Sequence, residues 1–221
     1  MFDFRILDNM TPEEIAARDE EVKRLEEKYA EEEREARFRK TVPERYWGET
    51  FDTYEVKNEM QKKALQSVRA FKSAIERDGF KTLVMLGSPG VGKTHLACSL
   101  IREHEGGKYR KAPDIIEELR RAKSFTADET EEQIVNYYGR VPLLVIDEIG
   151  RGINATDEKY MLYQVLNARY NTRRPTVLIS NFDKSDFLAY IGVAAADRLV
   201  ESAEIVELNG ESYRRILRGQ K

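Results

Sequence analysis

The segment from Gly87 to Thr94 has the residue types and the spacing that suit a polyphosphate. Its sequence, Gly-Ser-Pro-Gly-Val-Gly-Lys-Thr, fits the pattern G-x-x-x-x-G-K-[ST] at every fixed position. Glycines let the backbone curl inward, and a helix that begins at the loop adds free N–H groups and its positive dipole end. Lys93 is expected to neutralise the β- and γ-phosphates. The predicted nucleotide site comprises Gly87, Ser88, Pro89, Gly90, Val91, Gly92, Lys93, Thr94 and His95.

Acidic and amide side chains follow two later apolar runs. Asp147 and Glu148 come directly after residues 141–146, and Asn181 follows residues 176–180. Thr94 and Asp147 are expected to hold Mg²⁺, which prefers oxygen ligands and keeps most of its waters. Glu148 is expected to accept a proton from the attacking water or to orient it. Asn181 is expected to fix that water near the γ-phosphate, because ligands of open parallel sheets bind beyond the carboxyl ends of the strands.

Strands and helices must alternate to bring these side chains together. Apolar runs predict buried strands at residues 83–86, 141–146, 176–180 and 203–208, with an edge strand expected at 108–112. Besides the helix after the loop, helices are predicted at residues 59–78, 113–123, 126–138, 156–173, 184–190 and 193–200. Gly79 and Gly139 are expected to end the first and the third of this series. The alternation indicates an α/β fold with a parallel sheet.

The segment before the first predicted strand is divided into a charged helix and an aromatic connector. Thr11 and the residues after it form a helix start, and charged residues dominate from there to residue 40. A thin apolar stripe along this helix permits two interpretations, a solvated helix or an arm that lays Val22, Leu25 and Tyr29 into a partner's groove. We therefore expect a helical partner-binding arm at 1–40 and a second domain at 41–221. The aromatic residues of the connector, 41–54, either pack it onto that domain or border an adenine.

Composition narrows the class of protein. The 221 residues carry a formal net charge of −3, so the chain as a whole is not a basic nucleic-acid binder. Any DNA contact would use a local basic patch, for which the best candidates are Lys108, Arg110, Lys111, Arg120, Arg121 and Lys123. A single cysteine, Cys98, fits a reducing cytosol, and no apolar run approaches the ~18 residues of a membrane span. We expect a cytoplasmic protein with Cys98 buried and no zinc site.

An ordered series of short motifs resembles the DnaC/IstB-type AAA+ ATPases. It runs from the glycine loop and Thr-His-Leu-Ala at 94–97 to Leu-Leu-Val-Ile-Asp-Glu-Ile-Gly at 143–150. It continues with Arg-Tyr at 169–170, Arg-Pro-Thr at 174–176, Ser-Asn at 180–181 and Asp-Arg-Leu at 197–199. Pro-x-Arg-Tyr at 43–46, before Thr-Phe-Asp at 50–52, also looks like this family. The resemblance covers about residues 41–217, and the full ordered series is more specific than the glycine loop alone.

The resemblance implies a fold and further site residues. The fold would be an AAA+ P-loop NTPase, an αβα sandwich with a five-stranded parallel sheet in the order 5-1-4-3-2. Arg198 would be an arginine finger that reaches the γ-phosphate held by a neighbouring subunit, although a surface ion pair with Asp197 or Glu201 is the simpler interpretation. Arg214 would be a sensor-2-like arginine. The family also implies that no full helical lid domain follows.

Three functional hypotheses follow from this resemblance. The first is an ATP-dependent, Mg²⁺-dependent loader of a DnaB-like hexameric replicative helicase onto single-stranded DNA, with self-association through the AAA+ interface. The second is an IstB-like transposition helper ATPase that acts on duplex DNA. The third is a nucleotide-gated adaptor with negligible turnover. The short, charged N-terminal helix is closer to a minimal, phage-type loader than to the larger N-terminal regions usual in this family.

Overall fold

The computed structural model describes residues 11–124, 126–151 and 155–213, which form two units, Met1–Arg37 and Phe38–Lys221. The first unit contains most of helix α1 (Pro12–Thr41). At its start the Thr11 hydroxyl accepts a hydrogen bond from the Glu14 N–H, and the Glu14 carboxylate accepts one from the Thr11 N–H, as in a capping box. Pairs such as Glu20–Arg24, 2.7 Å apart and four residues apart in sequence, add support along an exposed helix that has little apolar surface to bury.

The second unit is built on a five-stranded sheet in the order β2-β3-β4-β1-β5. The strands are β1 (Thr82–Leu86), β2 (Gly107–Lys111), β3 (Leu143–Ile149), β4 (Thr176–Ser180) and β5 (Ala203–Glu207). Every neighbouring pair is parallel. Counted from the other edge, the order is 5-1-4-3-2, so the predicted fold class is confirmed, including the edge strand β2.

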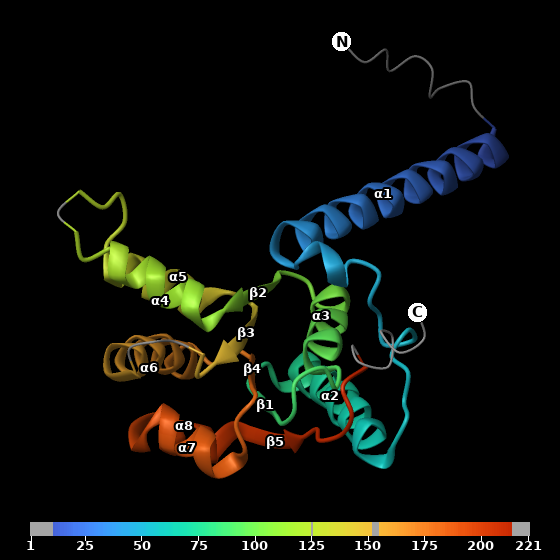
Figure 1. Cartoon of the computed structure of the whole chain (residues 1–221). Coiled ribbons are helices and arrows are strands. Elements are labelled where there is room, and N and C mark those ends of the chain that lie inside the picture. The colour runs from blue at the N-terminus through green and yellow to red at the C-terminus, as the bar shows by residue number, and fades with distance from the viewer. Residues whose placement is uncertain (1–10, 125, 152–154, 214–221) are drawn as a thin grey trace. The chain divides into compact units, whose positions relative to one another are not determined.

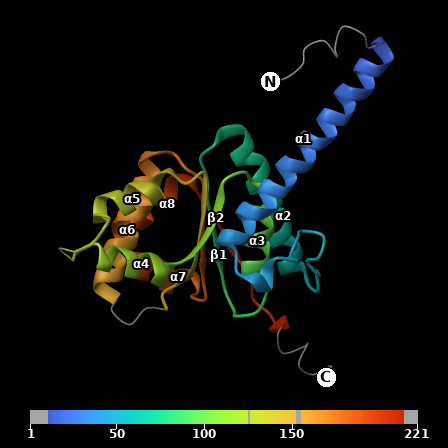
Figure 2. The same ribbon diagram turned by 90° about the horizontal axis from the view of Figure 1, so that it is seen from above.

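Helices cover both faces of this sheet (Figures 1 and 2). On one face lie α2 (Glu59–Asp78) and α3 (Lys93–Glu103). On the other lie α4 (Ala112–Arg121), α5 (Glu131–Arg140), α6 (Ala155–Asn171), α7 (Lys184–Ile191) and α8 (Val193–Ser202). Successive residues of the central strands alternate between the two hydrophobic cores: Leu83 faces the first layer and Val84 the second. Cys98 is buried in the first core, as expected.

Two predicted elements had wrong boundaries. Helix α5 begins at Glu131 and not at 126, because Thr130 caps it in a box with Gln133. Gly139 lies inside α5 and does not end it; a Cβ there would come within 3.0 Å of the Ala168 side chain on α6, so the glycine permits close packing of the two helices. The run predicted as a strand from 141 to 146 begins at Leu143 and continues through Asp147 and Glu148 to Ile149. The strand predicted at 203–208 and the other helices match to within a few residues.

A buried arginine ties the α4–α8 layer to the sheet. Arg169 on α6 is only 1% exposed. Its guanidinium donates to the Thr176 hydroxyl at 2.7 Å and to the main-chain oxygens of Pro175 at 2.6 Å and Val141 at 3.0 Å. Burial lowers the pKa of Arg169 to about 9. Arg169 therefore satisfies carbonyl groups just before β3 and β4 begin.

Candidate functional site

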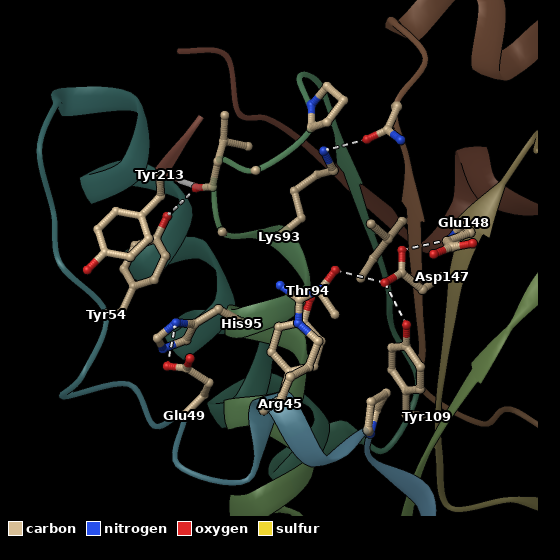
Figure 3. A pocket seen from close by; sticks show the side chains of 18 of the residues that line it. Arg45, Glu49, Tyr54, Lys93, Thr94, His95, Tyr109, Asp147, Glu148 and Tyr213 are labelled. Carbon is tan, nitrogen blue, oxygen red and sulfur yellow. Dashed lines mark hydrogen bonds and ion pairs between the residues drawn. The ribbon is translucent and has the colours of Figure 1, made fainter. Parts of the chain in front are cut away.

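A pocket of about 380 Å³ opens at the carboxyl ends of β1, β3 and β4. It is lined by most of the predicted nucleotide loop and by the predicted acidic and amide residues beyond β3 and β4. In Figure 3, Lys93 and Thr94 lie in the middle of this pocket, Tyr54 and Tyr213 on one side, and Asp147 and Glu148 on the other. The sequence thus identified the floor of the pocket, and the fold brings together segments that are far apart in the chain.

Two glycines of the loop lie so close to other parts of the chain that no other residue would fit there. Gly87 has a φ of +122°, and a Cβ on it would come within 2.1 Å of the Leu208 carbonyl oxygen after β5. Gly92, with a φ of +103°, lies against the Tyr54 ring, 2.5 Å from where its Cβ would be. The Tyr54 hydroxyl donates to the Val91 carbonyl at 3.2 Å. The connector and the residue that follows β5 therefore fix the glycine loop, and α3 begins at the end of this loop.

Lys93 occupies the centre of the loop. Its ammonium group donates to the main-chain oxygens of Gly87 at 2.6 Å and Ser88 at 2.8 Å, and to Oδ1 of Asn181 at 3.1 Å. The residue is 5% exposed. Three neutral oxygens thus lie against this buried ammonium group, and an anionic phosphate is a stronger partner than any of them. Asn181, predicted to contact the attacking water, lies beside this ammonium group.

The Asp147 carboxylate accepts three hydrogen bonds at the edge of the pocket. Its Oδ2 accepts hydrogen bonds from the Thr94 hydroxyl at 2.8 Å and the Tyr109 hydroxyl at 2.9 Å, and its Oδ1 accepts one from the Glu148 N–H at 2.7 Å. Thr94 and Asp147 present only oxygen atoms, the ligand type that Mg²⁺ requires. The donor set therefore fits the predicted magnesium site. Tyr109 was not anticipated as part of it.

Glu148 is held by two cations. Its carboxylate lies 3.3 Å from the Lys111 ammonium and 3.6 Å from the Arg151 guanidinium. Lys111 lies on the adjacent strand β2, where it is the register partner of Asp147. This position brings its ammonium group within reach of Glu148, the next residue along β3. Glu148 also has a φ of +59°, a left-handed conformation that is uncommon for glutamate and typical of functional sites. Lys111, predicted as a DNA contact, therefore lies in the nucleotide pocket.

The aromatic connector packs onto the second unit, and part of it lines the pocket. Phe51 and Tyr54 are buried in the first core, whereas Tyr46 and Tyr54 line the pocket. His95 is fixed from the connector: its Nδ1 lies 2.9 Å from the Glu49 carboxylate and its Nε2 lies 2.8 Å from the Thr50 carbonyl oxygen. His95 thus orders the connector beside the loop, which its place in the glycine motif did not indicate.

Arg45 was missed as a pocket residue. It points into the pocket from the 3-10 helix η2 (Glu44–Tyr46), with its guanidinium 4.7 Å from the Tyr46 ring centroid (Figure 3). The Pro-x-Arg-Tyr resemblance was a signal for it, because packing of the connector against an apolar core does not require an arginine in that motif. Arg45 adds a cation to the walls around a site already suited to phosphate.

Arg198 does not line the pocket of its own chain. It lies on α8, pairs with Asp197 at 3.1 Å and stacks 5.2 Å from the centroid of the Tyr170 ring. Within one chain this is the simpler ion pair that the sequence allowed. A contact between Arg198 and the site of a neighbouring subunit would form only in an assembly. Arg214, the predicted sensor-2-like residue, lies outside the described residues.

The predicted DNA and partner residues lie outside the loop. Five of the basic candidates have acceptors within the chain: Lys111 pairs with Glu148 as described, Lys108 bonds the Tyr137 hydroxyl, and ion pairs join Arg110 to Glu118, Arg120 to Glu158 and Arg121 to Glu117. Lys123 lies just beyond the end of α4. On α1 the predicted partner residues are all solvent-accessible, Val22 and Leu25 at 46% and Tyr29 at 64%. None of the described helices is long and apolar enough to span a membrane.

Comparison with known proteins gives one consistent picture. The family model described as IstB-like ATP binding protein matches residues 5–220. The replicative helicase loader DnaC of Escherichia coli K12 is 30% identical over 179 residues, which cover 78% of this chain and 71% of that protein. DnaC of Buchnera aphidicola from Acyrthosiphon pisum is 26% identical over 83% of this chain and 76% of its own length. A crystal structure of the DnaC helicase loader superposes with a TM-score of 0.66 at 26% identity, over 75% of this chain and 99% of that one.

Proposed function

The chain belongs to the family of IstB-like ATP-binding proteins, and from this premise we propose that it is an ATP-dependent loader of a hexameric replicative DNA helicase. The observation that carries the proposal is the convergence of Lys93, Asp147 and Glu148 in one pocket, in a chain similar along most of its length to proteins named helicase loaders. The family relation supports nucleotide binding, and the named relatives support the helicase as the partner.

ATP is proposed to bind with its phosphates along the glycine loop. Lys93 exchanges its carbonyl partners for the β- and γ-phosphate oxygens, which are charged and so stronger acceptors. Thr94 and Asp147 would hold Mg²⁺, which when bound screens the phosphate charge and orients the γ-phosphate. Glu148 takes a proton from the attacking water or orients it, and Asn181 positions that water. Tyr54 and Tyr213, on the far side of Lys93 in Figure 3, border the base.

The Lys111 and Arg151 contacts restrain Glu148 in the absence of substrate. These ion pairs hold the Glu148 carboxylate in place, so it must leave them to reach the attacking water. The isolated chain is therefore proposed to hydrolyse ATP slowly. Movement of β2 or of Arg151 in an assembly would release Glu148 for the attacking water.

Self-association is proposed to complete the catalytic site. Arg198 of one protomer reaches the γ-phosphate bound to its neighbour, where a guanidinium stabilises the charge that develops on phosphoryl transfer. The proposal is supported by the position of Arg198 outside its own pocket and by the modest worth of its exposed pair with Asp197. ATP then acts as the assembly switch and its hydrolysis as the release switch.

Helicase binding is proposed to use the apolar stripe on α1. Val22, Leu25 and Tyr29 lie at the three- and four-residue spacing by which a helix fills a partner's groove. The test is a pull-down of a DnaB-like helicase from the same source by the triple variant Val22→Ala, Leu25→Ala and Tyr29→Ala. Capture should fall at least about tenfold, as expected when the anchors of an interface are truncated. The matched control changes Glu21, Lys23 and Glu27 to alanine and should retain capture; equal capture by both triples would contradict this role of the arm.

Single-stranded DNA is proposed to follow the basic candidates on β2 and α4. Because five of the six already bond acceptors in the chain, one protomer offers little free positive charge, and affinity should come from several protomers in line. DNA binding should therefore require ATP and fall steeply with salt. Salt-independent binding by the monomer would contradict this arrangement.

The transposition helper is the second candidate, favoured by the IstB-like description of the matching family. Helper activity predicts ATP turnover stimulated by duplex DNA, with no capture of a helicase. Loader activity predicts helicase capture and a preference for single strands. A nucleotide-gated adaptor would bind ATP and show no difference between wild type and Glu148→Gln in any assay.

A further inference from the structure

The Asp147 carboxylate has a partner that the glycine loop does not supply. The Tyr109 hydroxyl donates to Oδ2 of Asp147 at 2.9 Å, onto the same oxygen that accepts from Thr94 at 2.8 Å (Figure 3). Tyr109 is 5% exposed and Asp147 is 6% exposed, so water has little access to this contact. A buried hydrogen bond to a charged acceptor strongly restricts how that acceptor can turn.

The position of this phenol follows from the strand register. Tyr109 pairs with Val145 across the β2–β3 ladder, and Asp147 lies two residues beyond Val145 on the same face of the sheet. The side chains of Tyr109 and Asp147 are thus diagonal neighbours, within reach of a long aromatic side chain. The hydroxyl thus reaches the carboxylate from the adjacent strand.

The main chain of Tyr109 is itself clamped. Strand β2 is at the sheet edge, where Tyr109 has no further strand to bond. The Thr41 hydroxyl takes that place: it accepts from the Tyr109 N–H at 2.8 Å and donates to the Tyr109 carbonyl at 3.1 Å. Thr41 is the last residue of α1, and Phe38 and Val42 beside it are buried in the first core. Two residues therefore connect the end of α1 to the predicted metal-binding carboxylate.

We propose that Tyr109 is a positioning residue that aims Asp147 at magnesium, and that Thr41 fixes Tyr109 for this task. The inference rests on the proposed nucleotide site. With the phenol in place, one lone-pair direction of Oδ2 is fixed, while the Thr94 hydroxyl takes another and the Glu148 N–H holds Oδ1. Without it, the carboxylate can rotate away from the position that a hydrated cation needs, as happens when outer partners of a metal site are removed.

The test compares Tyr109→Phe with Tyr138→Phe. Each removes one buried phenol hydroxyl that bonds a carboxylate, but Tyr138 bonds Glu118, away from the pocket. The affinity for ATP is measured by calorimetry across a series of Mg²⁺ concentrations and in EDTA. For Tyr109→Phe the Mg²⁺ concentration at half-maximal enhancement should rise about tenfold, while the EDTA affinity stays within about twofold of wild type. Tyr138→Phe should match wild type in both buffers.

Thr41→Val provides the second variant, because it keeps the side-chain shape and removes both main-chain bonds to Tyr109. It should shift the Mg²⁺ dependence in the same direction by a smaller factor. A Tyr109→Phe protein with the wild-type Mg²⁺ dependence would overturn the inference, as would one that lost affinity equally with and without Mg²⁺. Wild-type protein that bound ATP in neither buffer would instead overturn the proposed nucleotide site itself.

Discussion

The Thr94 hydroxyl donates a hydrogen bond to Oδ2 of Asp147 across 2.8 Å. Thr94 is on the first turn of α3, whereas Asp147 is near the end of β3. Parallel strands β1 and β3 are separated by β4 in the sheet, so their carboxyl ends bring these distant residues to one edge. Two oxygen ligands predicted separately for one cation thus lie in direct contact.

Changing Glu148 to glutamine separates binding from turnover. The amide has nearly the same size but cannot take a proton, and it loses the ion pairs with Lys111 and Arg151. Turnover should fall about 100-fold or more, which is the usual contribution of a general base. The dissociation constant for ATP, measured on the same samples, should change by less than about threefold. Wild-type turnover in this variant would remove Glu148 from the reaction.

Arg198 can be tested by complementation between two inactive proteins. Arg198→Ala should bind ATP normally and hydrolyse it at least about 100-fold more slowly, because the finger acts on a neighbour. Lys93→Ala should fail to bind ATP and still carry a finger. Mixing the two should restore ATPase activity at mixed interfaces, whereas Arg77→Ala, an exposed arginine on α2, should be active alone. A mixture as inactive as its components would assign Arg198 to its ion pair with Asp197.

Much of this site could be predicted from the sequence because its chemistry is local. The glycine loop, Thr94 and Asp147 belong to short motifs in which the neighbours in sequence are also the neighbours in space. The strand order came from the family resemblance, since short apolar runs do not state which strands are adjacent. The bounds of α2, Glu59–Asp78, followed from its periodicity and from the glycine after it.

The residues that were missed depend on contacts between strands or layers. Tyr109 was not predicted as a site residue, because its contact with Asp147 depends on β2 lying beside β3. Lys111 was predicted as a DNA contact because the sequence does not show that it lies opposite Asp147 on the neighbouring strand. Gly139 looked like a helix end because the close approach of α6 is invisible in the sequence. Arginine is usually found at the surface, and only the folded chain shows the main-chain carbonyl groups to which Arg169 donates hydrogen bonds.

Arg169→Met should destabilise the ATPase unit strongly. It removes a buried donor set and leaves main-chain oxygens of Val141 and Pro175 without that partner. The free energy of unfolding in urea should fall by about 3 kcal/mol. Arg174→Met, an exposed arginine nearby, should change it by less than about 0.5 kcal/mol. Equal effects of the two substitutions would show that the buried network contributes nothing specific.

His104 should make stability depend on pH near neutrality. Burial lowers the pKa of this half-buried imidazole below 6.5, its ordinary value. The unfolded chain therefore binds the proton first as pH falls, so the stability that neutral His104 contributes is present above pH 6.5 and is lost below it. Between pH 7.5 and 5.5, wild type should lose more free energy of unfolding than His104→Gln, by up to about 1.4 kcal/mol per pH unit. Identical pH profiles would contradict this.

The most direct test of the account is ATP binding by wild type and Lys93→Ala, measured by titration calorimetry in Mg²⁺ buffer. The wild-type chain should bind one ATP per protomer. Loss of the ammonium group removes about 3 kcal/mol of charge-assisted hydrogen bonding, so affinity should fall about 100-fold. Lys63→Ala, an exposed lysine on α2, should bind as wild type does. An unchanged dissociation constant for Lys93→Ala would contradict the claim that this loop holds the triphosphate.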